Sequence, residues 1–224
     1  MAYNLIFDLD ELRDRVDEVN PIDAQETVKA LISKLKKYPE LYALSAPQIG
    51  IKERVIVFKY KNNIYKEYIN PRIFKSEGYH LIREKDISSP DKEFISVRPS
   101  IIYVEYQTKD AKPETNVLKD NSAEVFDRLI NYLDGIPLED YGLEVLEGFD
   151  EASEDEREEV INMYLKSLKT RSNLLEENIQ EDKDARELRN AINFMEQVDE
   201  GKVTLERFED MTYNKKKNEM EKIC

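Results

Sequence analysis

Two patterns of hydrophobic and polar positions divide this chain of 224 residues. In its first part, ranges with helical spacing alternate with ranges rich in β-branched and aromatic residues. Residues 23–37 carry Val28, Leu31 and Leu35 at helical spacing, just after Pro21, so we predict a helix there. We predict strands where Val, Ile, Tyr and Phe concentrate, at residues 54–60, 65–69 and 100–106.

A second helix is predicted over residues 122–132. Val125, Leu129 and Tyr132 fall on one face of that helix, and Gly135 follows it as a stop signal. This part of the chain is therefore predicted to combine helices with strands.

The pattern changes after the first domain, to which we assign residues 1–141. Residues 142–152 form a predicted linker, and residues 153–224 have the acidic, periodic pattern of long helices. Ser153 and Glu156 have the spacing of a capping box, which starts a helix. Two heptad-like stripes follow, and we predict that they form an α-helical hairpin extension.

The stripes of this extension must bury against something. We expect contacts both with the first domain and with a neighbouring subunit. The candidate partner-binding residues are Ile161, Leu165, Leu168, Leu175, Ile179, Leu188, Ile192 and Met195.

Composition limits the partners further. A net charge of −14 argues against nucleic-acid binding, because phosphate contacts need clustered Lys and Arg. No apolar run approaches the roughly 18 residues of a membrane helix. The N-terminus also lacks the basic and apolar regions of a signal peptide. We therefore expect a protein that is made in a cytoplasm and binds other protein subunits, without a nucleic-acid, membrane or small-molecule partner.

Few residues are available for metal or nucleophile chemistry. The chain has one histidine, His80, and one cysteine, Cys224. These two cannot form a His/Cys metal cluster or a Ser-His-Asp triad, so we predict no cofactor. We interpret His80 as a surface histidine in a loop.

A metal site built from carboxylate and amide oxygens is the second possible arrangement. Asp127, Asn131 and Asp134 share one helix face and could join Asp86 in holding Mg²⁺ or Ca²⁺. We favour the alternative that this face is a solvent-exposed acidic stripe.

Three short segments carry a family signal. Residues 43–50 read Ala-Leu-Ser-Ala-Pro-Gln-Ile-Gly, residues 84–88 read Glu-Lys-Asp-Ile-Ser, and residues 127–135 read Asp-Arg-Leu-Ile-Asn-Tyr-Leu-Asp-Gly. In order and pattern they resemble the three signature motifs of peptide deformylases, A-P-Q-x-G, E-G-C-L-S and H-E-x-x-H. The resemblance implies the α+β class, with mixed or antiparallel sheets around a central helix. It also implies a metal held by the cysteine and the two histidines, and removal of the formyl group from new polypeptides.

The resemblance maps that site onto Gln48, Glu84, Asp86, Arg128, Leu129 and Tyr132. Asp86 stands for the cysteine, and Arg128 and Tyr132 stand for the histidines. A guanidinium offers a metal no lone pair, and leucine in place of the catalytic glutamate cannot act as a base. We therefore predict a degenerate site without catalytic or metal-binding residues and a chain that is not an enzyme.

The remaining site residues receive structural interpretations. Leu129 and Tyr132 are predicted to pack in the core, and Gln48 to form hydrogen bonds within its turn rather than to act as an oxyanion donor. Arg128 needs a counterion, so we predict an ion pair with Asp86 or Glu84.

These inferences favour a structural or assembly protein that uses a deformylase-like scaffold. Tailed bacteriophages carry genes of this family, and the Trp-free, Lys- and Ile-rich composition suggests an AT-rich genome. We expect a virion component made in a bacterial cytoplasm, such as a neck or tail ring subunit present in several symmetric copies. Two alternatives remain open: a hydrolase with a rebuilt site around Gln48, Glu84 and Asp86, and a cytosolic binding module.

Overall fold

The computed structural model describes residues 4–60 and 63–176, with side chains as far as Leu168. Among the predicted partner-binding residues, the side chains of Leu175, Ile179, Leu188, Ile192 and Met195 lie outside the described part of the chain. Within that part, no helix is long and apolar enough to cross a membrane.

Four α-helices and two short 3₁₀ helices occur in the described residues. The α-helices are α1 (Leu9–Leu12), α2 (Gln25–Lys37), α3 (Asn121–Leu133) and α4 (Glu154–Glu176). The 3₁₀ helices are η1 (Pro47–Ile49) and η3 (Leu138–Asp140). The predicted helices at residues 23–37 and 122–132 are therefore confirmed as α2 and α3.

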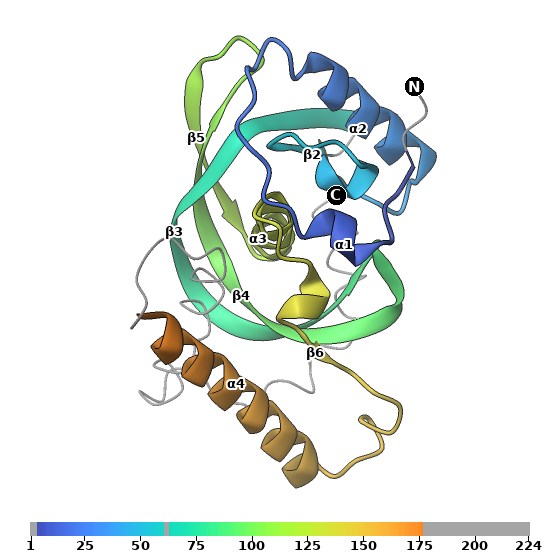
Figure 1. Cartoon of the computed structure of the whole chain (residues 1–224), viewed down its shortest axis with the longest axis vertical. Helices are drawn as coiled ribbons and strands as arrows, with labels where there is room; N and C mark the ends of the chain where they lie inside the picture. Colours follow the sequence, from blue (N-terminus) through green and yellow to red (C-terminus); the bar gives the residue numbers. More distant parts are fainter. Residues whose placement is uncertain (1–3, 61–62, 177–224) are drawn as a thin grey trace.

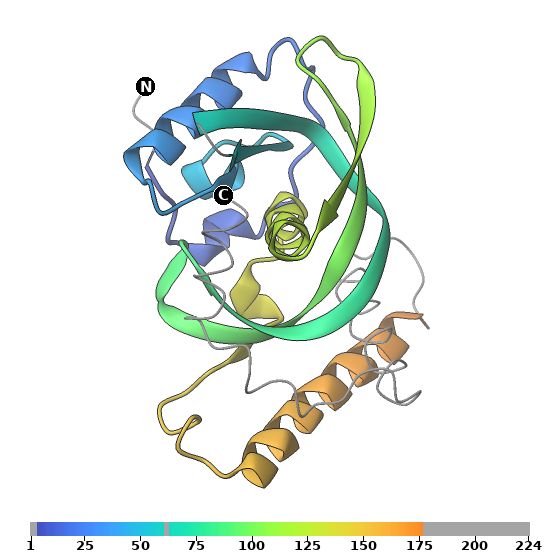
Figure 2. The same ribbon diagram turned by 180° about the vertical axis from the view of Figure 1, so that it is seen from behind.

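The strands form one antiparallel sheet in the order β1-β2-β3-β4-β5, with β6 added beside β4. Their bounds are β1 (Ala43–Ser45), β2 (Val55–Tyr60), β3 (Ile64–Asp86), β4 (Ser89–Gln107), β5 (Pro113–Lys119) and β6 (Leu143–Glu144). The long β3–β4 hairpin curls around α3, which Figures 1 and 2 show end-on in the middle of the sheet. The predicted α+β class with a central helix is confirmed.

The length of this hairpin differs from the sequence-based prediction. The strands predicted at residues 65–69 and 100–106 are parts of the much longer β3 and β4. The stretch around His80, interpreted as a loop, lies inside β3 and pairs with β4. That interpretation was wrong because the polar run Lys75-Ser76-Glu77 and Gly78 interrupt the apolar pattern before His80, although β3 continues through them.

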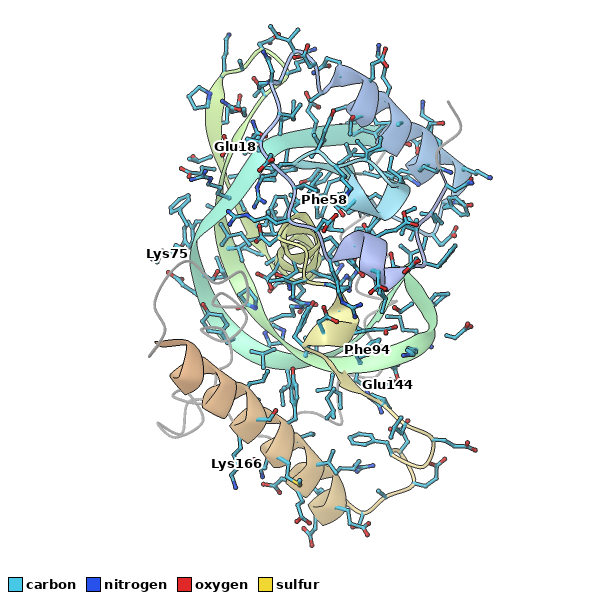
Figure 3. All side chains as sticks on the ribbon, in the orientation of Figure 1. Glu18, Phe58, Lys75, Phe94, Glu144 and Lys166 are labelled. Atoms are coloured by element: carbon cyan, nitrogen blue, oxygen red, sulfur yellow. The ribbon has the colours of Figure 1, made fainter. Side chains whose placement is uncertain are left out.

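The central helix α3 is buried because the sheet covers most of its surface. Phe126, Leu129 and Leu133 of α3 pack in one cluster with Tyr68 of β3 and Ile102 of β4. Phe58 of β2 points toward this helix in Figure 3, and its ring stacks on Phe126 at 5.5 Å between centroids. Leu129 is 2% exposed, so its predicted place in the core is confirmed.

Helix α4 packs on the opposite face of the hairpin from α3. Successive strand residues point to opposite faces, so odd-numbered residues of β3 and β4 in this region point away from α3. Four of them, with three of the predicted partner-binding residues, form a single cluster of Tyr79, Leu81, Ile95, Val97, Ile161, Leu165 and Leu168. The described part of the predicted stripe is therefore buried against the chain's own sheet.

The outward face of α4 carries both charged and apolar side chains. Lys166 lies on the side of the helix that points away from the sheet in Figure 3. Val160 and Met163 are also exposed, at 41% and 64%. These two apolar side chains lie one helical turn apart and therefore on the same face.

Candidate functional site

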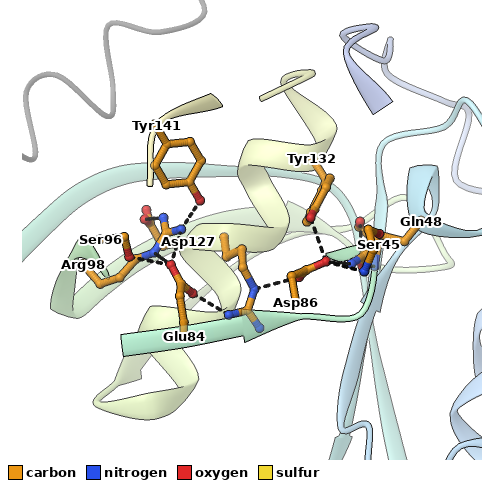
Figure 4. A network of polar contacts seen from close by, with 11 residues as sticks. Ser45, Gln48, Glu84, Asp86, Ser96, Arg98, Asp127, Tyr132 and Tyr141 are labelled. Atoms are coloured by element: carbon orange, nitrogen blue, oxygen red, sulfur yellow. Dashed lines mark hydrogen bonds and ion pairs between the residues drawn. The ribbon is translucent and has the colours of Figure 1, made fainter. Parts of the chain in front are cut away.

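The fold brings the three motif segments together. Glu84 and Asp86 are two residues apart near the end of β3, so both side chains point to the same face of the sheet. Arg128 and Tyr132 are four residues apart on α3 and share a helix face. Figure 4 shows Tyr132 and Gln48 both directed at Asp86.

Gln48 is held by its own turn. Its Oε1 accepts hydrogen bonds from the backbone N–H of Ser45 at 3.1 Å and from the Ser45 hydroxyl at 3.2 Å. The turn ends at Gly50 with φ of 75°, a left-handed conformation that glycine adopts without strain. The Gln48 amide nitrogen donates to Asp86 Oδ1 at 3.4 Å. Hydrogen bonding within the turn agrees with the prediction, while the contact with Asp86 was not foreseen.

Asp86 is buried among hydrogen-bond donors. Its Oδ1 accepts from the Tyr132 hydroxyl at 2.7 Å and from the Ser88 backbone N–H at 2.8 Å. Its Oδ2 lies 3.1 Å from Arg128 Nε, an ion pair in which the N–H is not aligned as a hydrogen bond. Burial and the neighbouring Asp86 charge raise the pKa of Tyr132 well above its ordinary value. Tyr132 is therefore a neutral donor at physiological pH.

Glu84 forms the second half of the same network. Its Oε1 accepts from Ser96 Oγ at 2.5 Å and from Arg98 Nε and Nη2 at 3.0 and 2.9 Å. Its Oε2 pairs with Nη1 of Arg128. Burial by itself would raise the pKa of Glu84, but the charges of Arg98 and Arg128 outweigh it and lower the pKa to about 2. Glu84 is thus ionised throughout the physiological pH range.

The predicted ion pair of Arg128 is confirmed, and it involves both carboxylates. Arg128 links Glu84 to Asp86 and so joins the two halves of the network. In a region shielded from water such charge-assisted contacts are stronger than on the surface.

Arg98 is the charged residue of this site that sequence reasoning missed. Its side chain is 0% exposed, and its Nη1 donates to Asp127 Oδ2 at 2.7 Å in addition to the contacts with Glu84. Its guanidinium also donates to the Tyr141 hydroxyl. The only sequence signal was an arginine at an inward-facing position of a largely hydrophobic strand.

The solvent-exposed acidic stripe predicted on α3 was wrong. Asp127 and Asn131 are both 0% exposed, because the sheet encloses the helix face on which they lie. Asp134 pairs with Arg54 at 2.8 Å, and Asp127 with Arg98.

The surface position inferred for His80 also needs correction. Its Nε2 lies 2.8 Å from Glu124 Oε1 on α3, and its side chain is only 25% exposed. His80 therefore ties the sheet to the central helix.

The residues present do not fit the metal that the resemblance implies. The guanidinium of Arg128 occupies the space beside Asp86, and Arg128 brings a positive charge and no lone pair. No group of three or more His, Cys, Asp or Glu side chains that could hold a metal occurs in the part of the chain that the structure describes. Asp86, Asp127 and Asp134 face separate arginines and do not converge on one point.

An antiparallel sheet curled around one helix, with these three motifs at its centre, defines a deformylase-type domain. The family described as Polypeptide deformylase matches residues 5–143. The chain therefore belongs to the polypeptide deformylase family.

Individual relatives agree with that assignment. A peptide deformylase of Prosthecochloris aestuarii is 28% identical over 138 residues, which are 58% of this chain and 74% of the relative. One of Pelotomaculum thermopropionicum is 32% identical over 127 residues, 56% of this chain and 81% of the relative.

Solved structures are similar as well. The peptide deformylase of Thermotoga maritima matches with a TM-score of 0.57 and 26% identity, over 62% of this chain and 97% of that structure. A probable peptide deformylase from Synechococcus phage S-SSM7 matches with a TM-score of 0.57 and 28% identity, over 62% of this chain and 99% of that structure.

These comparisons contradict the prediction that the chain is not an enzyme. The relatives share its family and are named for an enzymatic activity. The prediction rested on the substituted motif residues and on the single histidine and cysteine, and family membership overturns it.

Proposed function

We propose that this chain is an assembly subunit of a large protein complex, such as a bacteriophage particle, and that it binds neighbouring subunits through the outward face of α4. Binding and turnover are separate properties, and this proposal concerns binding. Its main support is the apolar pair Val160 and Met163, which is exposed on a helix whose opposite face is already buried.

Two further observations support this role. The carboxylates of the motif region are held in a connected set of ion pairs between β3, β4 and α3, which gives the domain a fixed framework. A probable peptide deformylase from a phage has the same fold, which supports a phage origin for this chain. A particle would assemble in the cytoplasm of a bacterial host, which is the location that we propose.

The test combines a matched pair of surface variants with particle analysis. Val160→Asp together with Met163→Asp places charge on the apolar pair, while Ile22→Asp makes the same kind of change at an exposed apolar residue outside α4. We expect the full chain to enter purified particles, the double variant to be lost from them, and Ile22→Asp to behave like the unchanged chain. If the double variant is incorporated as well as the unchanged chain, α4 is not the binding surface. If the unchanged chain never enters particles, the virion role is wrong.

Family membership favours a second candidate, hydrolysis of formylated peptides at a site rebuilt around Gln48, Glu84 and Asp86. Glu84 would act there as a fixed negative charge, because its pKa of about 2 leaves it without a proton to donate. Turnover of a formyl-methionyl peptide by the full chain, compared with Gln48→Ala and the exposed control Ser167→Asp, tests this candidate. Activity that Gln48→Ala abolishes and Ser167→Asp retains would establish it. No release of formate above a buffer blank would exclude it for that substrate.

A further inference from the structure

The surroundings of Asp86 reverse the usual arrangement of a metal site. A metal site places lone pairs around a cation. Here donors surround an anion: the Tyr132 hydroxyl, the Ser88 backbone N–H and the Gln48 amide approach Oδ1, and Arg128 lies beside Oδ2. The side chain of Asp86 is only 2% exposed. Neutral donors combined with one guanidinium are a set that recognises a carboxylate.

Contacts that do not involve Asp86 help to hold two of these donors in place. Gln48 is fixed by the backbone and hydroxyl of Ser45. Arg128 is fixed by Glu84, which is itself held by Arg98. Tyr132 projects from the buried helix α3, where it is 1% exposed. The donor arrangement is therefore built by the surrounding structure and should outlast removal of the Asp86 carboxylate.

We propose that this pocket is a carboxylate-binding site whose resident ligand is the chain's own Asp86. Removing the Asp86 carboxylate should open the site to a small free carboxylate such as formate. The class of ligand follows from the donors alone, and the inference is independent of which partner or substrate the whole protein has.

The Asp86→Ala variant provides the direct test. It keeps Cβ and removes one carboxylate group, which has the size and shape of a formate ion. Thermal unfolding of the full chain is followed with increasing sodium formate, and with sodium chloride at equal ionic strength. We expect the variant to unfold at a lower temperature than the unchanged chain. Formate should raise its midpoint by about 3–6 °C at ten times the dissociation constant, and above that constant the midpoint should keep rising with the logarithm of the formate concentration. The unchanged chain should not respond, because its site is occupied.

Two further variants test whether formate binds at the Asp86 site in particular. Asp134→Ala also removes a carboxylate that pairs with an arginine, and among the described residues that carboxylate is paired with Arg54 rather than surrounded by several donors. Formate should shift Asp134→Ala much less than Asp86→Ala. Adding Arg128→Met to Asp86→Ala removes the charged donor and should abolish the formate response.

Several outcomes would overturn the proposal. They are the absence of a formate shift in Asp86→Ala, equal shifts in the unchanged chain or in Asp134→Ala, and an equal effect of chloride. If Asp86→Ala is recovered only unfolded, its refolding yield in formate against chloride replaces the thermal midpoint as the readout. A yield that is higher in formate supports the site, and equal yields refute it.

Discussion

Replacing Arg98 by methionine should be among the most damaging single changes in the described domain. Arg98→Met keeps most of the side-chain volume but leaves Glu84 and Asp127 buried without their shared guanidinium. Removing one partner of a buried ion pair typically costs about 3–5 kcal/mol of unfolding free energy. For a chain of this size, each kcal/mol corresponds to roughly 2–4 °C, so the midpoint of thermal unfolding should fall by about 6–20 °C.

The pH dependence of the unfolding free energy provides a second test of this prediction. Glu84 has a pKa lowered from 4.5 to about 2, so its ion pairs stabilise the fold fully above the ordinary carboxyl pKa, and this contribution is lost as pH falls toward 2. Loss of Arg98 removes one of the charges that keep the pKa of Glu84 low. The deficit of Arg98→Met relative to the unchanged chain should therefore be largest near neutrality and shrink in acid, where Glu84 becomes protonated.

Urea unfolding of the full chain, near neutrality and again between about pH 3 and pH 5, measures both effects. Arg13→Met is the matched control, because Arg13 also contacts two carboxylates, Asp10 and Asp140, but at the exposed surface. Adding Glu84→Gln to Arg98→Met should recover part of the loss, since it removes a buried carboxylate charge that Arg98 no longer balances. A loss no greater than that of Arg13→Met, or one that does not change with pH, would refute this account of the network.

Three further predictions follow from the same contacts. Leu129→Ala should lower the free energy of unfolding by about 2–5 kcal/mol in urea titrations because it leaves a cavity beside the sheet, whereas the exposed Val117→Ala should have little effect. Tyr132→Phe should cost about 1–3 kcal/mol, because Asp86 loses its 2.7 Å donor, and stability equal to that of the unchanged chain would contradict the assigned contact. Leu165→Ala should loosen α4 from the sheet and speed limited proteolysis in residues 142–152, while cleavage at the unchanged rate would show that α4 does not depend on this contact.

The local sequence pattern determined helices α2 and α3, and the motif resemblance indicated the class of the fold. The spacing of Val125, Leu129 and Tyr132 specifies one apolar helix face whatever surrounds it, and α3 forms over those residues. The ion pair of Arg128 was also predictable, because a guanidinium among apolar motif residues needs a counterion and the motifs supplied two candidates.

Tertiary structure decided the rest of the site. Polar runs and Pro99 interrupt the apolar pattern of β3 and β4, so only their pairing with each other and their packing on both faces reveal their length. Arg98 meets Glu84 and Asp127 because the hairpin curls around α3, and these contacts join residues 14 and 29 positions away in the chain. Asp127 and Asn131 have the spacing of a polar stripe on one helix face. The same spacing occurs whether that face is exposed to solvent or covered by a sheet. The sequence alone could therefore specify the helix face, while burial of that face depended on long-range packing.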